Sequence, residues 1–444
     1  MSSKAGGGGV ESWLSGSRLG PAGRRFDEHM GLSKVRLVGA LWLLGTLLIH
    51  ARFLWVSKDL VWKGYPDFTI YYTAGTMVRL GWGRQLYNDA KQFEVQRNFA
   101  PQVSSRFGAL PFNHPPFEAA LFAPLSFLPY RSAYLLWWVA NLGMLAAMPI
   151  VLRAHVPLMG AFPIPVWILA SLAFLPIFLA LLQGQDAILL LLLYVLAFAS
   201  LKSGRPVWAG AWLAGGLFKF HLVLPFLVLL LLEVRQRKRI ACGFAAVAGV
   251  LLAASTATVG IEGVLSYPRY VLSLEAATAA GAIKPSDMPN VRGLLSLLAP
   301  SLPNFNWVVI LLSAILFLIA AWIARSSASD RSGLVFSLLL FTTVLVSYHS
   351  LGYDLSILAL PMLLLAAWLG DSRSTANWTR TTILVGWLFL LFSPLQLILL
   401  LHHNHLGWLA LALLLCYAGM VGELTPRNRQ LATSEARLVG KQEN

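Results

Sequence analysis

The sequence is poor in charged residues and in cysteine. Of its 444 residues only 12% carry a charge, whereas 57% are apolar. Soluble globular domains average about 25% charged residues, so this chain has too few to cover a water-facing surface. The two cysteines, Cys242 and Cys416, fall in apolar runs and cannot form a disulfide framework or a zinc cluster. We expect both to be small buried residues, and the chain to be an integral membrane protein.

Acidic residues are also scarce, because 19 aspartates and glutamates face 34 lysines and arginines, which gives a net charge of +15. In a membrane protein this excess marks cytoplasmic loops and anionic lipid rather than nucleic acid. The sequence has no P-loop, no GxGxxG after a strand and no HExxH, which argues against nucleotide-driven transport, dehydrogenation and zinc proteolysis. We expect no cofactor and no nucleic-acid partner, and we assign no metal ligands. The histidine-rich segment 402–405 has the composition of a metal site, but its place between two apolar spans favours a polar turn.

Long apolar runs fill most of the chain and predict an all-α, polytopic membrane helical bundle. Residues 1–34 are rich in Gly and Ser with several arginines, which is typical of a disordered basic cytoplasmic tail, and 423–444 predict a second one. Residues 35–422 predict a transmembrane domain of about twelve spans, each of which needs roughly 20 residues. Six apolar segments lie between 115 and 233, and the topology requires that one of them does not cross fully.

A large outer loop, 57–112, follows an uncleaved first span that we place at 37–49. The loop is rich in aromatic residues, which argues against disorder and predicts short helices on the outer membrane surface. Asp67 lies near the start of the loop, directly after Pro66. Its carboxylate could cap the helix that follows, or act as a general base that accepts a proton from an attacking hydroxyl.

Further polar side chains persist in apolar surroundings, where they are costly and commonly functional. His114, at the end of the outer loop, is either an interface residue or part of a site. Lys219, with His221, lies between two short half-spans and could neutralise a lipid-linked phosphate or snorkel at a helix end. His349 and Asp354 lie near an outer helix end, and their spacing is weak evidence for a metal pair.

Taken in order, short motifs between residues 40 and 370 resemble glycosyltransferase family 87, polytopic bacterial enzymes that include polyprenol-phosphate-mannose-dependent mannosyltransferases. The order and spacing of the motifs carry the resemblance, from which Asp186 departs because Asn is more common after Gly-Gln. The matching elements are Pro66-Asp67-Phe68, Tyr71-Tyr72, Ala74-Gly75, Leu86-Tyr87, His114-Pro-Pro-Phe117, Ala123-Pro-Leu125, Gly184-Gln185, Gly215 with Lys219, and His349 with Tyr353-Asp354.

The resemblance implies a C-type glycosyltransferase fold in the cell membrane, with its active site on the extracytoplasmic face. It implies Asp67 as the catalytic base and His349 as a second catalytic residue beside the sugar or the leaving phosphate. The donor would be a polyprenyl-phosphate sugar, and the acceptor a glycan, a glycolipid or a protein. The expected substrate-binding residues are Tyr71, Tyr72, His114, Gln185, Lys219, His221, Arg292 and Asp354.

The implied reaction is attack by an acceptor hydroxyl opposite the leaving phosphate, which inverts the anomeric carbon as water does in inverting glycosidases. Cations such as Lys219, Arg292 or a protonated His349 would stabilise the departing phosphate. The alternative is a secondary transporter or a flippase of lipid-linked sugars, because broken half-spans suit it too. Transporters place their polar groups near the midplane, whereas Asp67 and His114 are predicted at one face. A structural scaffold would not need such clustering.

Overall fold

The computed structural model describes residues 32–101, 110–276, 284–326, 332–371, 377–402 and 405–425. Every regular element within these ranges is a helix and none is a strand, which confirms the predicted all-α class. The predicted tails, 1–34 and 423–444, lie almost entirely outside the described residues, as do His403 and Asn404 of the predicted polar turn.

Six helical segments are long and apolar enough to cross a membrane. Three further pairs of helices are sharply bent and could each form one more span, which gives six to nine candidate spans in the described ranges. The predicted count of twelve is therefore not confirmed. The six are α3 (Leu32–Trp62), α7 (Tyr130–Leu152), α13 (Arg237–Ala276), α15 (Phe305–Ser326), η8 (Gly352–Leu358) with α17 (Ala359–Asp371), and η9 (Leu406–Trp408) with α20 (Leu409–Leu424).

The bent pairs break where the sequence interrupts a helix. Pro176 and Pro394 lie in the first turns of α9 and α19, where a missing N–H costs no helical hydrogen bond. The bends are 83° between α8 (Ile164–Ala173) and α9 (Leu175–Gln183), 61° between α11 (Pro206–Gly215) and η5 (Leu217–Lys219) with α12 (Phe220–Glu233), and 59° between α18 (Asn377–Leu391) and α19 (Ser393–Leu401).

The remaining elements are short. Residues 115–129, one of the six predicted apolar segments, form only α6 (Pro116–Phe122) and η3 (Ala123–Phe127), which are too short to cross a bilayer. The others are α4 (Phe68–Arg79), η1 (Gly83–Gln85), α5 (Asp89–Phe99), η4 (Pro157–Gly160), α10 (Ala187–Lys202), η6 (Pro285–Asp287), α14 (Val291–Leu298) and α16 (Ser332–Val346).

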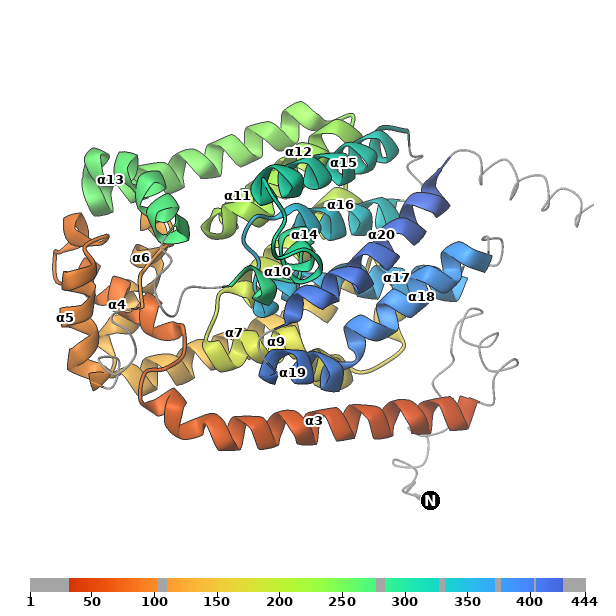
Figure 1. Cartoon of the computed structure of the whole chain (residues 1–444), viewed down its shortest axis with the longest axis horizontal. Helices are drawn as coiled ribbons and strands as arrows, with labels where there is room; N and C mark the ends of the chain where they lie inside the picture. Colours follow the sequence, from red (N-terminus) through yellow and green to blue (C-terminus); the bar gives the residue numbers. More distant parts are fainter. Residues whose placement is uncertain are drawn as a thin grey trace, which may run out of the picture.

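Helix α3 lies along the outside of the bundle (Figure 1). It continues past Arg52 to Trp62 without a break, so the helix extends beyond the predicted span at 37–49. His50 attaches this helix to the bend between α8 and α9. Its Nδ1 lies 2.9 Å from the carbonyl oxygen of Leu172, and its ring stacks on Phe178 with the centroids 4.3 Å apart.

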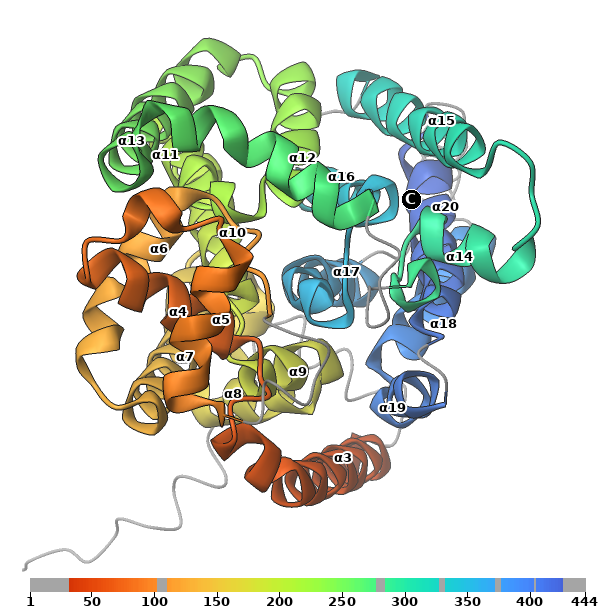
Figure 2. The ribbon, with the colours of Figure 1, turned by 60° about the vertical axis from the view of Figure 1, so that its left-hand side comes forward.

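The helices surround a buried centre. Figure 2 shows α17 in the middle of a ring of helices, and 61% of the apolar stretch that includes α17 is buried within the protein. Helix α4 (Phe68–Arg79) and α5 (Asp89–Phe99) lie at one end of the molecule with α6, whereas the start of α3 and the end of α20 lie at the opposite end (Figure 1).

Helix α4 is packed inside the protein rather than laid on its surface. Eight of its twelve residues are buried, and a Cβ added at Gly75 would lie 2.6 Å from the carbonyl oxygen of Phe122. The prediction of short helices on the membrane surface did not anticipate that α4 is enclosed by protein. The ring of Phe68 meets that of Tyr134 in α7 edge to face, and the ring of Tyr71 stacks on that of Phe122 in α6.

Helices α11 and α13 approach each other closely through small residues, as membrane helices commonly do. A Cβ at Gly210 would lie 2.0 Å from the carbonyl oxygen of Ile240, and one at Gly243 would lie 1.9 Å from that of Val207. Cys242, the neighbour of Gly243, is exposed on α13, whereas Cys416 is buried. The prediction of burial therefore holds only for Cys416, because an apolar run does not reveal which face of a helix meets protein.

Candidate functional site

Five interruptions of the helices bring polar side chains together inside the protein. Asp67 precedes α4, His114 precedes α6, Asp186 lies between α9 and α10, Lys219 ends η5, and Asp354 lies in η8. Backbone that leaves the helix is tolerated at membrane depth only where protein or a cavity surrounds it. These breaks are also where the chain can turn a charged side chain away from lipid.

Asp67 is held by partners from distant parts of the chain. Its Oδ2 accepts a hydrogen bond of 2.7 Å from Nε2 of Gln185, and its backbone N–H donates to Oε1 of Gln183 at 3.2 Å. The carboxylate makes no capping bond to α4 and its residue has helical φ and ψ, so the capping interpretation is wrong.

The orientation of Gln185 follows from its neighbours. The hydroxyl of Tyr71 donates to its Oε1 at 2.7 Å, and the ammonium of Lys219 lies 3.5 Å from the same oxygen. Its Nε2 therefore faces Asp67, because a carboxylate can only accept. Burial raises the pKa of Asp67, and the hydrogen bond from Gln185 and the charge of Lys219 partly oppose that rise. Asp67 nevertheless remains partly exposed, unlike Gln185.

Lys219 is buried between two carboxylates. Its Nζ lies 2.8 Å from Oδ1 of Asp354 and 3.1 Å from Oδ1 of Asp186. The alternative of a lysine snorkelling at a helix end is therefore wrong, since the ammonium ends inside the bundle. Asp354 uses its second oxygen to accept the backbone N–H of Leu351 at 2.8 Å, which fixes the start of η8.

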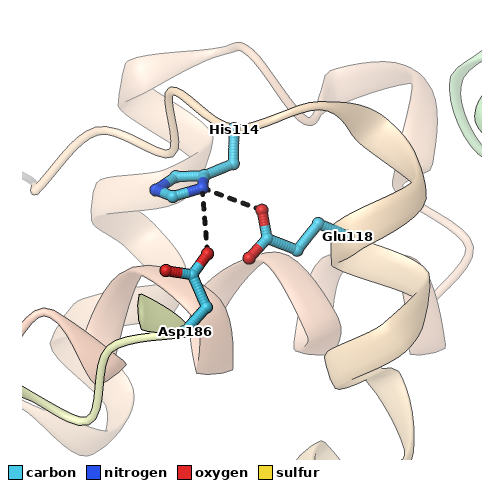
Figure 3. A group of neighbouring side chains, drawn as sticks. All are labelled: His114, Glu118 and Asp186. Carbon is cyan, nitrogen blue, oxygen red and sulfur yellow. Dashed lines mark ion pairs between the residues drawn. The ribbon is translucent and has the colours of Figure 1, made fainter. Parts of the chain in front are cut away.

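One ring nitrogen of His114 points toward the carboxylates of Glu118 and Asp186 (Figure 3). Its Nδ1 lies 2.8 Å from Oε2 of Glu118 and 3.8 Å from Oδ2 of Asp186. Burial lowers the pKa of His114 to about 4 and, with the neighbouring Asp186, raises the pKa of Glu118 well above its usual value. Sequence reasoning missed Glu118. The available signal was its i,i+4 spacing from His114 at a helix start, in an otherwise apolar segment.

Three more predicted residues lie close to one another beside this cluster. The rings of His221 and His349 meet edge to face with centroids 6.0 Å apart. The guanidinium of Arg292 lies 3.9 Å from the ring centroid of Tyr348 and donates to its carbonyl oxygen at 3.2 Å. His349 and Arg292 are both partly exposed, so this side of the site is more open than the carboxylate cluster.

Tyr72 is the predicted substrate-binding residue that the structure does not bring into the cluster. Its hydroxyl donates to the carbonyl oxygen of Leu128 at 2.7 Å, and its ring packs edge to face against Phe99 and Tyr130. Its neighbour Tyr71 points the other way, toward Gln185 and His114. The double-tyrosine motif therefore has one residue at the site and one in the packing behind it.

A comparison with known protein families finds a match. The sequence model of glycosyltransferase family 87 matches residues 112–348, which is more than half of the chain. The matched range contains His114, Gln185, Lys219, His221 and Arg292, and ends one residue before His349. None of the curated proteins matches the chain. None of the solved structures does either.

Proposed function

The chain belongs to glycosyltransferase family 87, and we propose that it transfers a sugar from a polyprenyl-phosphate donor to an acceptor hydroxyl. Its several apolar helices make it a multi-pass membrane protein. A lipid-linked donor suits such a protein because the prenyl chain can lie among the apolar spans. We place the reaction on the extracytoplasmic face, where no nucleotide sugar is available, and take mannose as the sugar from the resemblance of the motifs.

The observation that carries this proposal is the geometry of Asp67. Its carboxylate makes no capping bond to the helix that follows it, is partly exposed, and accepts a hydrogen bond from Gln185. A carboxylate fixed in this way can accept the proton of an acceptor hydroxyl as the hydroxyl attacks the anomeric carbon. Holding base and substrate in one geometry is itself a large part of the catalytic effect. Attack opposite the phosphate in a single step inverts the configuration.

The departing phosphate requires positive charge. We propose Arg292 and His349 for this role because they are partly exposed and come from neighbouring positions on the open side of the site. Lys219 is already paired with Asp186 and Asp354, so it reaches a phosphate only by leaving one of them. The acceptor is a glycan, a glycolipid or a protein.

Family membership does not favour the alternative of a transporter or flippase of lipid-linked sugars. The two proposals differ in what happens to the donor. A flippase moves the intact lipid-linked sugar across the bilayer, whereas a transferase breaks the bond between sugar and phosphate. Mass analysis of the products formed by purified protein in lipid separates these outcomes directly.

Asp67→Asn tests the proposed base. We expect sugar transfer to fall by about 100-fold to 10,000-fold, the usual contribution of a general base, because the amide cannot accept the proton. The measurement is the rate of product formation from labelled polyprenyl-phosphate sugar by protein in lipid.

Asp59→Asn is the matched control, since Asp59 is an exposed carboxylate near the end of α3. The Asp59→Asn protein should transfer sugar at the wild-type rate. Wild-type turnover by folded Asp67→Asn protein would overturn the proposed mechanism.

A further inference from the structure

His114, Glu118 and Asp186 form a compact group of metal-binding side chains. One ligand atom from each lies within 4.8 Å of the other two, and Figure 3 shows the Nδ1 of His114 directed between the two carboxylates. Ligands of one divalent ion sit about 2.0–2.3 Å from it, so atoms at this mutual spacing fit a common ion. Glu118 and Asp186 are at most 1% exposed, whereas His114 is partly exposed.

The hydrogen bonds around Tyr71 favour one tautomer of His114. The Asp67 carboxylate can only accept, so Gln185 donates to it and presents Oε1 to Tyr71. The hydroxyl of Tyr71 donates its single proton to Oε1 of Gln185. The hydroxyl oxygen of Tyr71 can then accept a hydrogen bond from Nε2–H of His114, 3.5 Å away. The neutral ring then has a lone pair on Nδ1, aimed at Glu118 and Asp186.

With Glu118 ionised, this arrangement places three acceptors face to face, so the group must take up either a proton or a cation. Neither carboxylate oxygen of Glu118 receives a hydrogen bond, although the side chain is fully buried. Buried carboxylates are costly unless they are paired or coordinate a metal. Lys219 pairs with Oδ1 of Asp186 and with Asp354, which leaves Glu118 and Oδ2 of Asp186 without a cation of their own.

We propose that His114 Nδ1, Glu118 and Asp186 bind a divalent cation. The ligands are one imidazole nitrogen and two carboxylates. This mixed donor set suits Mn²⁺ or Zn²⁺ better than it suits Mg²⁺ or Ca²⁺, which prefer oxygen ligands alone. Tyr71 accepts from the other ring nitrogen, the outer-shell contact that usually orients a ligating histidine. The ion supplies the positive charge that the buried carboxylates lack.

This inference does not depend on the proposed function, since it follows from the side chains alone. The ion would lie beside the hydrogen-bonded chain that ends at Asp67, because Gln185 and Asp186 are consecutive residues. Failure of metal binding would leave the assignment of Asp67 untouched, and failure of sugar transfer would leave the metal site untouched.

Metal binding by the full-length protein tests the proposal. Protein in lipid nanodiscs, stripped with EDTA, is titrated with Mn²⁺ alone, and free Mn²⁺ is followed by electron paramagnetic resonance, with Zn²⁺ as competitor. We expect one saturable site per chain. Glu118→Gln should weaken binding by about 10-fold or more, as the loss of a ligand or its support does. Glu423→Gln is the matched control, because Glu423 is also buried but lies in α20 beside Thr379.

A second measurement covers the case in which Glu118→Gln does not fold. Pulsed electron paramagnetic resonance of the Mn²⁺-loaded wild-type protein should detect one imidazole nitrogen, and this signal should disappear in His114→Asn. The proposal is overturned if the wild-type protein has no saturable site for Mn²⁺ or Zn²⁺. It is also overturned if Glu118→Gln binds as the wild type does, or if the nitrogen signal persists in His114→Asn, as it would for an ion at His402 or His405.

Discussion

At the scale of single residues, Gln185 connects the groups that we assign to proton transfer. Its amide donates to Asp67 and accepts from Tyr71, so it orients the carboxylate and stabilises its charged form. Gln183, two residues earlier, accepts a hydrogen bond from the backbone N–H of Asp67 and not from its carboxylate. The two glutamines therefore offer a direct comparison between a bond to the carboxylate and a bond to the backbone.

Gln185→Met should shift the pH dependence of sugar transfer. A base works only when deprotonated, so the rate falls as pH decreases through the pKa of Asp67, which burial has raised. Losing the donor from Gln185 removes an interaction that lowers this pKa, so we expect the acidic limb of the kcat/KM profile to move to higher pH. Gln183→Met should leave the position of that limb unchanged. An acidic limb at the same pH in Gln185→Met and in the wild type would contradict the proposed effect of Gln185 on the pKa of Asp67.

The sequence predicted several members of the site but not the role of each. Asp67 was ambiguous between a helix cap and a base, and the structure removes only the cap, because the carboxylate makes no capping bond and instead accepts from Gln185, 118 residues away. Glu118 was missed because a lone acid in an apolar segment has no motif of its own. Lys219 was correctly singled out as unusual, but its two carboxylate partners could not be identified from their positions in the chain.

At the scale of elements, helix breaks and small residues determine how the bundle closes. The contact between α11 and α13 depends on Gly210 and Gly243, where the backbones approach too closely for a side chain. At Gly249, further along α13, an added Cβ would meet nothing within 4 Å. Replacement by alanine should therefore have opposite effects on stability at Gly243, which is tightly packed, and at Gly249, which is not.

Gly243→Ala should destabilise the protein, because the added Cβ would lie 1.9 Å from the carbonyl oxygen of Val207. Overpacking of this kind costs about 1–3 kcal/mol of unfolding free energy. Gly249→Ala should be neutral or stabilising by up to about 1 kcal/mol, since alanine favours the helix over glycine. Thermal unfolding in the same lipid or detergent measures both variants, and equal midpoints would refute the close contact.

At the scale of the whole molecule, we expect the end that carries α5 to lie outside the cell. The start of α3 and the end of α20 share the opposite end (Figure 1), and the basic cluster from Arg235 to Arg239 separates α12 from α13. Such clusters are retained in the cytoplasm. Asp67 lies in the connection between α3 and α4, so the sidedness of this end decides whether the proposed base can meet an extracytoplasmic acceptor.

Single cysteines report the sidedness. In a background with Cys242→Ser and Cys416→Ser, the exposed position in Glu94→Cys should react with a membrane-impermeant maleimide added to intact cells. Lys238→Cys, also at an exposed position, should react only after the membrane is opened. The reverse pattern would place the proposed base in the cytosol and exclude the extracytoplasmic reaction.

The membrane-embedded, all-helical class and the family follow from apolar runs, charge bias and the order of short motifs, because these are properties of the linear chain. Which polar groups meet depends on how the helices pack. Helix packing brings Asp67, His114, Asp186, Lys219 and Asp354 into one cluster although they are far apart along the chain. It also bends the half-spans and buries α4, because those outcomes depend on which helix faces find protein rather than on local composition.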